Sequence, residues 1–140
     1  MTSSPAPDSG ERNPARAIAI VAGHGSFAEG LVSAADQIAG CGDVFVTLSN
    51  SGLAGEDIEA HFRGVAVDRG IRVFFTDLPG GSATMAVRRL MRTEKDLVLV
   101  TGANLAALLE FAFHAETDPA GAARRAAEKG RASITTSESL

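Results

Sequence analysis

The chain has 140 residues, a hydrophobic fraction of 45%, a charged fraction of 21% and a formal net charge of −4. This length predicts one compact domain, and the composition excludes a wholly disordered chain. The acidic balance disfavours a surface for nucleic acid or anionic membrane, and the absence of Trp and Tyr leaves only Phe and His for base stacking.

Cysteine usage and the first residues set further limits. The single cysteine, Cys41, excludes an internal disulfide and a cysteine-based zinc cluster, and we assign it no chemistry. No apolar run approaches the roughly 20 residues that span a bilayer, so direct membrane insertion is not expected. Residues 1–16 are polar and lack the order of a secretory signal, so we expect a flexible lead-in to a domain at 17–140. A cytoplasmic protein is predicted.

Short apolar runs alternate with segments of helical periodicity along the domain. The runs predict strands buried on both faces at 17–22, 44–48, 71–76 and 97–101. The periodic segments predict helices at 27–39, 56–68, 83–91, 105–115 and 120–129. The segment 132–136 is a candidate for a last, short edge strand. In the first three helices the residues at apolar spacing are Phe27, Leu31, Ala34, Ala35 and Ile38, then Ile58, Phe62 and Val65, then Ala86, Val87 and Leu90.

The alternation of strands and helices predicts an α/β fold, a doubly wound and mainly parallel sheet with helices on both faces. Crossover connections in such sheets are right-handed by default. Ligands bind where the carboxyl ends of the strands diverge. The functional residues are therefore expected in the loops that directly follow the strands.

The first of these loops carries a histidine between two glycines, at Gly23, His24 and Gly25. The glycines allow a sharp turn and leave the imidazole unscreened. Ser26 and Glu29 have the spacing of a capping box at the start of the following helix. The helix N-terminus would then offer N–H groups and partial positive charge to a phosphate beside His24. A structural histidine in a tight turn is the alternative.

The second loop begins with a carboxylate, Asp77, at the end of the third strand. Gly80 and Gly81 follow and can direct N–H groups at an anion. Ser82 is a natural N-cap for the next helix. The alternative is that Asp77 and Ser82 are helix-capping residues and that the glycines form an ordinary turn, with no role in binding an anion.

The two loops together indicate a specific chemistry. In a doubly wound sheet the first and third strands are neighbours, so Asp77 is expected near His24. A carboxylate bonded to one ring nitrogen fixes the tautomer and leaves the other nitrogen free to act as a nucleophile. Asp77 would also stabilise a cationic phospho-imidazole. The backbone at Gly25 and Ser26, and the loop from Gly80 to Ser82, would bind the phosphoryl oxygens.

Other polar residues are given structural roles. Asn104, in the loop at 102–104 after the fourth strand, is expected to be an N-cap, with a place at the edge of the same cleft as the alternative. His61 and His114 lie within predicted helices. No cluster of His, Asp and Glu has metal-ligand spacing, so no metal is expected.

Three motifs, at 18–25, 76–82 and 102–105, resemble the enzyme IIA component of the mannose-type sugar phosphotransferase system, in the branch with fructose and N-acetylgalactosamine members. The resemblance runs from about residue 18 to about residue 136. It implies a phosphorelay in which His24 takes a phosphoryl group from the phosphocarrier protein HPr. The group then passes to a histidine of the enzyme IIB component for sugar uptake.

The resemblance also implies structure and site roles. It implies a sheet in the order 2-1-3-4, and a homodimer that exchanges an antiparallel C-terminal strand, for which 132–136 is the matching stretch. Asp77 matches the family's histidine partner, and Ser82 matches its phosphoryl-contacting serine. No bound cofactor is implied, because the phosphoryl group arrives on a protein.

Three other functions compete with this interpretation. Residues 23–28 fit the dinucleotide motif G-x-G-x-x-A, but the second strand ends without the acidic residue that binds the ribose. A histidine phosphatase or mutase needs an arginine beside the histidine, and Ala22 and Gly23 stand there. A regulatory protein of the same fold, which uses phosphorylation as a signal, would share the chemistry at His24 and stays open.

Overall fold

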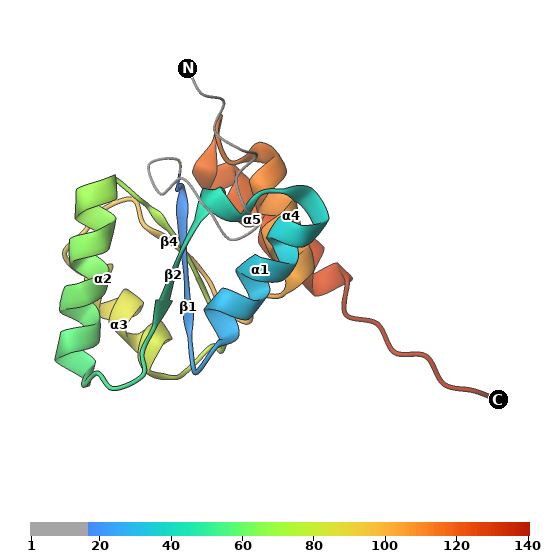
Figure 1. Ribbon diagram of the computed structural model, residues 1–140, viewed down its shortest axis with the longest axis horizontal. Coiled ribbons are helices and arrows are strands. Elements are labelled where there is room, and N and C mark those ends of the chain that lie inside the picture. The colour runs from blue at the N-terminus through green and yellow to red at the C-terminus, as the bar shows by residue number, and fades with distance from the viewer. Residues whose placement is uncertain (1–16) are drawn as a thin grey trace, which may run out of the picture.

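The computed structural model describes residues 17–140, and the expected lead-in at 1–16 lies outside them. A four-stranded sheet runs through the molecule in the order β2-β1-β3-β4, with every neighbouring pair parallel (Figure 1). The predicted α/β fold and the strand order implied by the resemblance are both confirmed. The strands are β1 (Ala19–Gly23), β2 (Phe45–Ser49), β3 (Val73–Thr76) and β4 (Val98–Val100).

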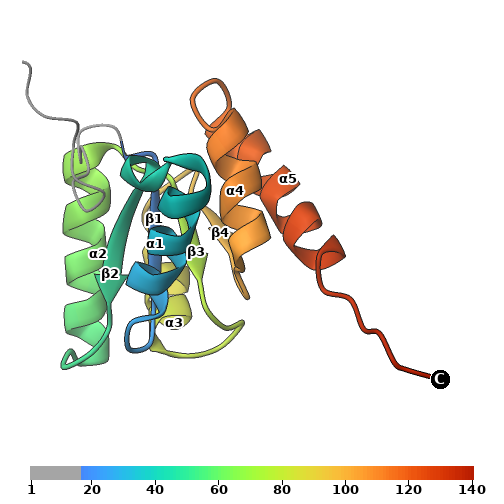
Figure 2. The same ribbon diagram turned by 45° about the vertical axis from the view of Figure 1, so that its right-hand side comes forward.

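Helices cover both faces of the sheet. Helices α2 and α3 lie on one face, and α1, α4 and α5 lie on the other (Figures 1 and 2). A short 3-10 turn, η2 (Gly42–Val44), leads into β2. The helices are α1 (Phe27–Ala39), α2 (Gly55–Arg69), α3 (Ser82–Leu90), α4 (Leu105–His114) and α5 (Pro119–Ala132).

The sheet divides the apolar core into two layers. In β3, Val73 and Phe75 pack with residues of α1, α4 and α5, whereas Phe74 packs with residues of α2 and α3. Successive side chains of a strand point to opposite faces, so a sheet covered on both sides needs apolar residues at every position. This requirement explains the continuous apolar runs of β1 and β3, whose residues are all buried.

Helix α1 buries its predicted apolar stripe only in part: Ala35 is buried, and Phe27 and Leu31 pack partly buried against the core. Ile38 is 62% exposed, although its spacing suggested an inward position. The buried stripe has the same helical period but is shifted by one residue, and its two alanines let the helix lie close to the sheet. In α2, Ala66 rather than Val65 completes the buried stripe. The buried residues of α1 are Ala28, Val32 and Ala35.

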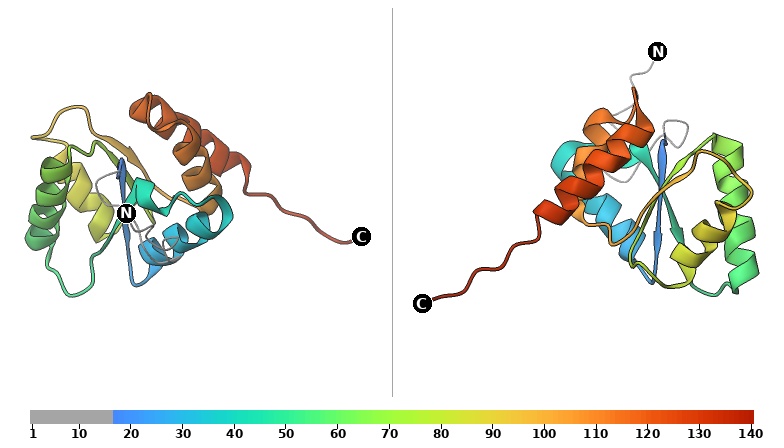
Figure 3. Two further views of the ribbon diagram at one scale, coloured as in Figure 1. Left: turned by 45° about the horizontal axis from the view of Figure 1, so that its top comes forward. Right: turned by 180° about the vertical axis from the view of Figure 1, so that it is seen from behind.

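The C-terminal segment also differs from the prediction. Helix α5 continues to Ala132, and residues 133–140 form no strand with the described part of the chain. Figure 3 shows this segment extending away from the rest of the molecule. The predicted edge strand at 132–136 therefore does not form within the single chain, in which Ala132 is the last residue of α5.

Replacing Phe111 by Ala is expected to lower the free energy of unfolding by about 3–5 kcal/mol. Its ring is fully buried, and its centroid lies 5.1 Å from that of Phe75 in an edge-to-face arrangement. The matched control is Phe113→Ala on the same helix, where the side chain is 74% exposed and the expected change is below about 0.5 kcal/mol. Urea titrations followed by circular dichroism measure both, and equal losses would contradict this assignment of the core.

Candidate active site

His24 lies directly after β1, in the tight turn that leads into α1. The N–H of Phe27 donates to the carbonyl of His24 at 3.0 Å, which closes the turn. Gly25 has a φ of +51°, in the left-handed region that favours glycine. The turn leaves the side chain of His24 58% exposed. The imidazole is therefore accessible from solvent.

Asp77 reaches this imidazole because β1 and β3 are neighbours. The register pairs Ala22 with Thr76, so the residues that follow leave the sheet side by side. One carboxylate oxygen of Asp77, Oδ2, accepts a hydrogen bond from the backbone N–H of His24 at 2.9 Å. The same oxygen lies 2.7 Å from Nδ1 of the His24 ring. The structure thus brings together the two residues that the loop positions predicted to meet.

The ionisation of Asp77 sets the tautomer of His24. Burial by itself raises the pKa of the Asp77 carboxyl, but the hydrogen bonds from the backbone and ring of His24 and the other favourable interactions outweigh it, and the pKa lies below its ordinary value. An ionised carboxylate can only accept hydrogen bonds. Nδ1 must then carry the proton, which leaves a lone pair on Nε2. Nε2 is therefore the ring nitrogen whose lone pair is available for bonding.

Two glycines make room for this contact. A Cβ on Gly23 would lie 2.7 Å from Oδ2 of Asp77 and 2.8 Å from the Phe27 ring, so a side chain there would displace the carboxylate. Gly81 has a φ of +95° and lies against the outer edge of the imidazole. A Cβ on Gly81 would lie 3.2 Å from Cε1 of His24 and 4.0 Å from Nε2. The loop before α3 therefore faces the free nitrogen.

The two serines do not cap as predicted. Helix α3 begins at Ser82 itself, and Gly81 holds the N-cap position, so the prediction of Ser82 as N-cap is wrong. Ser26 holds the N-cap position of α1 but makes no side-chain cap bond, so the capping box with Glu29 does not form. Its φ and ψ of −94° and 18° differ from the extended conformation that aims a capping oxygen at the helix N–H groups.

The predicted phosphoryl-binding residues share the carboxyl edge of the sheet. Gly25 and Ser26 are exposed at the start of α1, and Gly80, Gly81 and Ser82 are exposed at the start of α3. Each helix start presents N–H groups that have no partner inside the helix. Both sets of N–H groups therefore lie at the edge of the sheet that carries His24.

Sequence reasoning missed two polar side chains that hold this edge. The hydroxyl of Thr84 hydrogen-bonds with the hydroxyl of Thr76 at 2.7 Å and with the carbonyl of Leu78, and both threonines are fully buried. Asn50 donates from Nδ2 to the hydroxyl oxygen of Ser82. A polar residue at an inward position of α3, and the first amide after β2, are the sequence features that could have identified them.

The third loop has a structural role. Asn104 caps α4, since its side-chain oxygen accepts from the N–H of Ala107 at 3.0 Å, which confirms the predicted N-cap. Its Nδ2 donates to the carbonyl of Gly130 at 2.9 Å and so ties α4 to α5. A Cβ on Gly130 would lie 2.9 Å from Oδ1 of Asn104, which explains the glycine.

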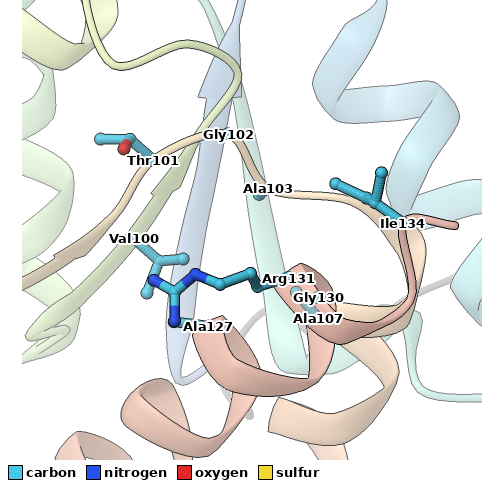
Figure 4. Close-up of a pocket in the computed structure, with 9 residues that line it drawn as sticks. All are labelled: Val100, Thr101, Gly102, Ala103, Ala107, Ala127, Gly130, Arg131 and Ile134. Carbon is cyan, nitrogen blue, oxygen red and sulfur yellow. The ribbon is translucent and has the colours of Figure 1, made fainter.

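A cavity of about 210 Å³ lies between this loop and α5 (Figure 4). Gly102 and Ala103 form one side of it, and Arg131 and Ile134 belong to the other. Neither His24 nor Asp77 lines the cavity. The loop after β4 therefore lines a cavity to which the histidine and the carboxylate do not contribute.

The other two histidines lie on helices, as their sequence positions predicted. His61 is exposed on α2, and His114 is exposed on α4 beside Glu110, at 3.3 Å between Nε2 and Oε2. Among residues 17–140, no group of three or more His, Cys, Asp or Glu could hold a metal ion. Over the same part of the chain, no helix has the length and apolar character needed to cross a membrane.

Comparison with known families gives a match over most of the chain. The model of a family described as "PTS system fructose IIA component" matches residues 18–128. A search of curated proteins gave no significant match.

Solved structures of similar fold carry related descriptions. The mannose/sorbose-specific IIA subunit of the phosphotransferase system from Enterococcus faecalis aligns with a TM-score of 0.75 and 21% identity over 89% of this chain and 97% of that one. Component EIIA from Streptococcus agalactiae aligns with a TM-score of 0.75 and 21% identity over 84% and 95%. The IIA protein associated with the fucose utilization operon of Streptococcus pneumoniae has a TM-score of 0.73 and 22% identity over 84% and 90%. At these identities the likeness establishes the fold.

The lowered pKa of Asp77 predicts a pH-dependent contribution to stability. A carboxyl whose pKa is lower in the folded state stabilises the fold at pH values above its unfolded pKa, about 3.9. That contribution is lost as the pH falls through the folded value. The difference in unfolding free energy between the wild type and Asp77→Asn is therefore expected to be largest near neutral pH and to shrink below about pH 4. Urea titrations from pH 7 to pH 3 test this, and a constant difference would contradict it.

Proposed function

Because the chain belongs to the family of phosphotransferase-system IIA components, we propose that it is a phosphohistidine carrier of a sugar phosphotransferase system. His24 accepts a phosphoryl group from HPr and passes it to a histidine of an enzyme IIB component, in the cytoplasm, for the uptake and phosphorylation of a sugar. The observation that carries the proposal is the exposed imidazole whose Nδ1 lies 2.7 Å from the Asp77 carboxylate.

In the proposed step, the lone pair on Nε2 of His24 attacks phosphorus on the phosphorylated HPr. The bond between phosphorus and Nε2 forms while the bond between phosphorus and its donor atom on HPr breaks. Nδ1 keeps its proton, so the ring becomes cationic and the Asp77 carboxylate beside it is ready to stabilise that charge. Transfer onward to enzyme IIB runs through the same states in reverse order.

The phosphoryl oxygens are proposed to bind at the two helix starts. The backbone at Gly25 and Ser26 and the loop from Gly80 to Ser82 flank the imidazole, and helix N-termini favour anions. No cofactor takes part, because the phosphoryl group arrives on a protein. Positioning and charge stabilisation supply the catalysis, as in phosphoryl transfer generally.

Replacing His24 by Ala is expected to abolish phosphorylation and leave the fold intact. The assay is mass spectrometry of the intact protein after incubation with phosphoenolpyruvate, enzyme I and HPr, where the wild type should gain one acid-labile phosphate. His61→Ala, which removes another exposed histidine, is the matched control and should be labelled like the wild type. Asp77→Ala keeps the acceptor atom and should be labelled more slowly.

Two results of this assay would count against the proposal. One is a wild-type protein that stays unmodified while a known IIA protein in the same mixture is phosphorylated. The other is a His24→Ala protein that gains the phosphate. A labelled wild type that fails to pass its phosphate to any enzyme IIB would favour the regulatory role over transport.

We further propose that two copies of the chain form a dimer through the edge of β4. Within the described residues, β4 pairs with a strand only on its β3 side, so its other edge has free N–H and C=O groups. The segment 133–140 extends from the molecule, and its Ile134 is 74% exposed. Antiparallel pairing of 132–136 with β4 of a second copy would cover both.

Deleting residues 134–140 is expected to shift the protein from dimer to monomer, because the deletion removes the strand that would pair with the partner. Light scattering during size-exclusion chromatography measures the mass in solution. The matched control removes only 138–140 and keeps the pairing segment, and it should remain a dimer. A truncated protein that is still a dimer would rule out this mode of association.

A further inference from the structure

Asn50 connects two parts of the carboxyl edge that are distant in sequence. It follows β2, and its backbone N–H lies 3.4 Å from the carbonyl of Gly23, the residue before His24. Its side-chain Nδ2 donates to the hydroxyl oxygen of Ser82 at the start of α3. One residue therefore bridges the turn that carries the imidazole and the loop that faces its free nitrogen.

The direction of this hydrogen bond decides what Ser82 can do. A serine hydroxyl has one proton to donate and two lone pairs that accept. The amide nitrogen of Asn50 uses a lone pair of the Ser82 oxygen, and it offers no acceptor for the Ser82 proton. The hydroxyl proton of Ser82 is thereby left to point elsewhere.

The residues around Ser82 indicate which group its hydroxyl proton can reach. Gly81, the residue before it, lies against the Cε1–Nε2 edge of His24. Helix α3 is fixed to β3 by the buried hydrogen bonds of Thr84, so the loop cannot drift away from the ring. The Ser82 hydroxyl thus belongs to the residue that directly follows the one against the ring, from where it can reach a phosphoryl group on Nε2.

We propose that Asn50 is a positioning residue for phosphoryl transfer, one that holds the Ser82 hydroxyl as a hydrogen-bond donor to the phosphoryl group on His24. This inference rests on the proposed function. Asn50 itself does not touch the reacting atoms. Its neutral amide is suited to the task, because a carboxylate at the same place would accept the Ser82 proton and repel the phosphoryl oxygens.

The test is a double-mutant cycle on the rate of phosphoryl transfer from radiolabelled phospho-HPr. Asn50→Ala is expected to lower the maximal rate roughly tenfold, the size of one hydrogen bond to a charged group. The HPr concentration that gives half the maximal rate should stay unchanged, because the docking surface is intact. Asn50→Ala combined with Ser82→Ala should be no slower than Ser82→Ala alone, because both changes remove the same hydrogen bond.

Asn50→Asp provides a variant of the same shape. It should be slower than Asn50→Ala, because the carboxylate takes the Ser82 proton and adds negative charge. Melting temperatures of all variants separate a loss of rate from a loss of fold. A merely structural Asn50 would show a wild-type rate in the folded fraction, or losses that add to those of Ser82→Ala.

Either of those results, or an Asn50→Asp protein as fast as Asn50→Ala, would overturn the inference. Failure of this inference can be distinguished from failure of the proposed function. A wild-type protein that takes no phosphate from HPr would contradict the carrier role itself, whereas a wild type that is phosphorylated with unaffected Asn50 variants contradicts only the role of Asn50.

Discussion

The arrangement at the carboxyl edge of the sheet depends on the largely buried carboxylate of Asp77, which accepts hydrogen bonds from two N–H groups of His24. Oδ2 of Asp77 accepts from both the backbone and the ring of His24, while Oδ1 is buried and has no hydrogen-bond partner among residues 17–140. Loss of a hydrogen-bond partner would leave the buried charge of Asp77 uncompensated, which is strongly destabilising. The imidazole is therefore held firmly in its position against the carboxylate. The placement of β1 beside β3 is what makes this contact possible.

The sheet separates the apolar core from the polar groups at the ends of its strands. Its two faces are covered by separate apolar layers, which fix the positions of the strand ends. Three of those ends then supply different chemical groups: the imidazole after β1, the amide after β2 and the carboxylate after β3. Groups held on registered strands need little reorganisation when the reacting charge develops.

The amino-acid sequence predicts most of this arrangement, and the exceptions have physical reasons. The apolar runs define the strands, and their order brings His24 and Asp77 together. Periodicity alone cannot tell which of two adjacent stripes of a helix faces the sheet, so the exposure of Ile38 was missed. Capping depends on backbone angles that residue types do not determine, as Ser26 shows. The partner of Asn50 depends on a contact across three elements, which spacing cannot reveal.

The absence of a side chain at Gly23 controls the contact between Asp77 and His24. A methyl group at that position would lie 2.7 Å from Oδ2 of Asp77, an atom at the free end of its side chain. A larger residue before the histidine would therefore push the carboxylate away from the ring, although both members of the pair would still be present in the chain. The size of this one residue thus limits how closely the carboxylate can approach the imidazole.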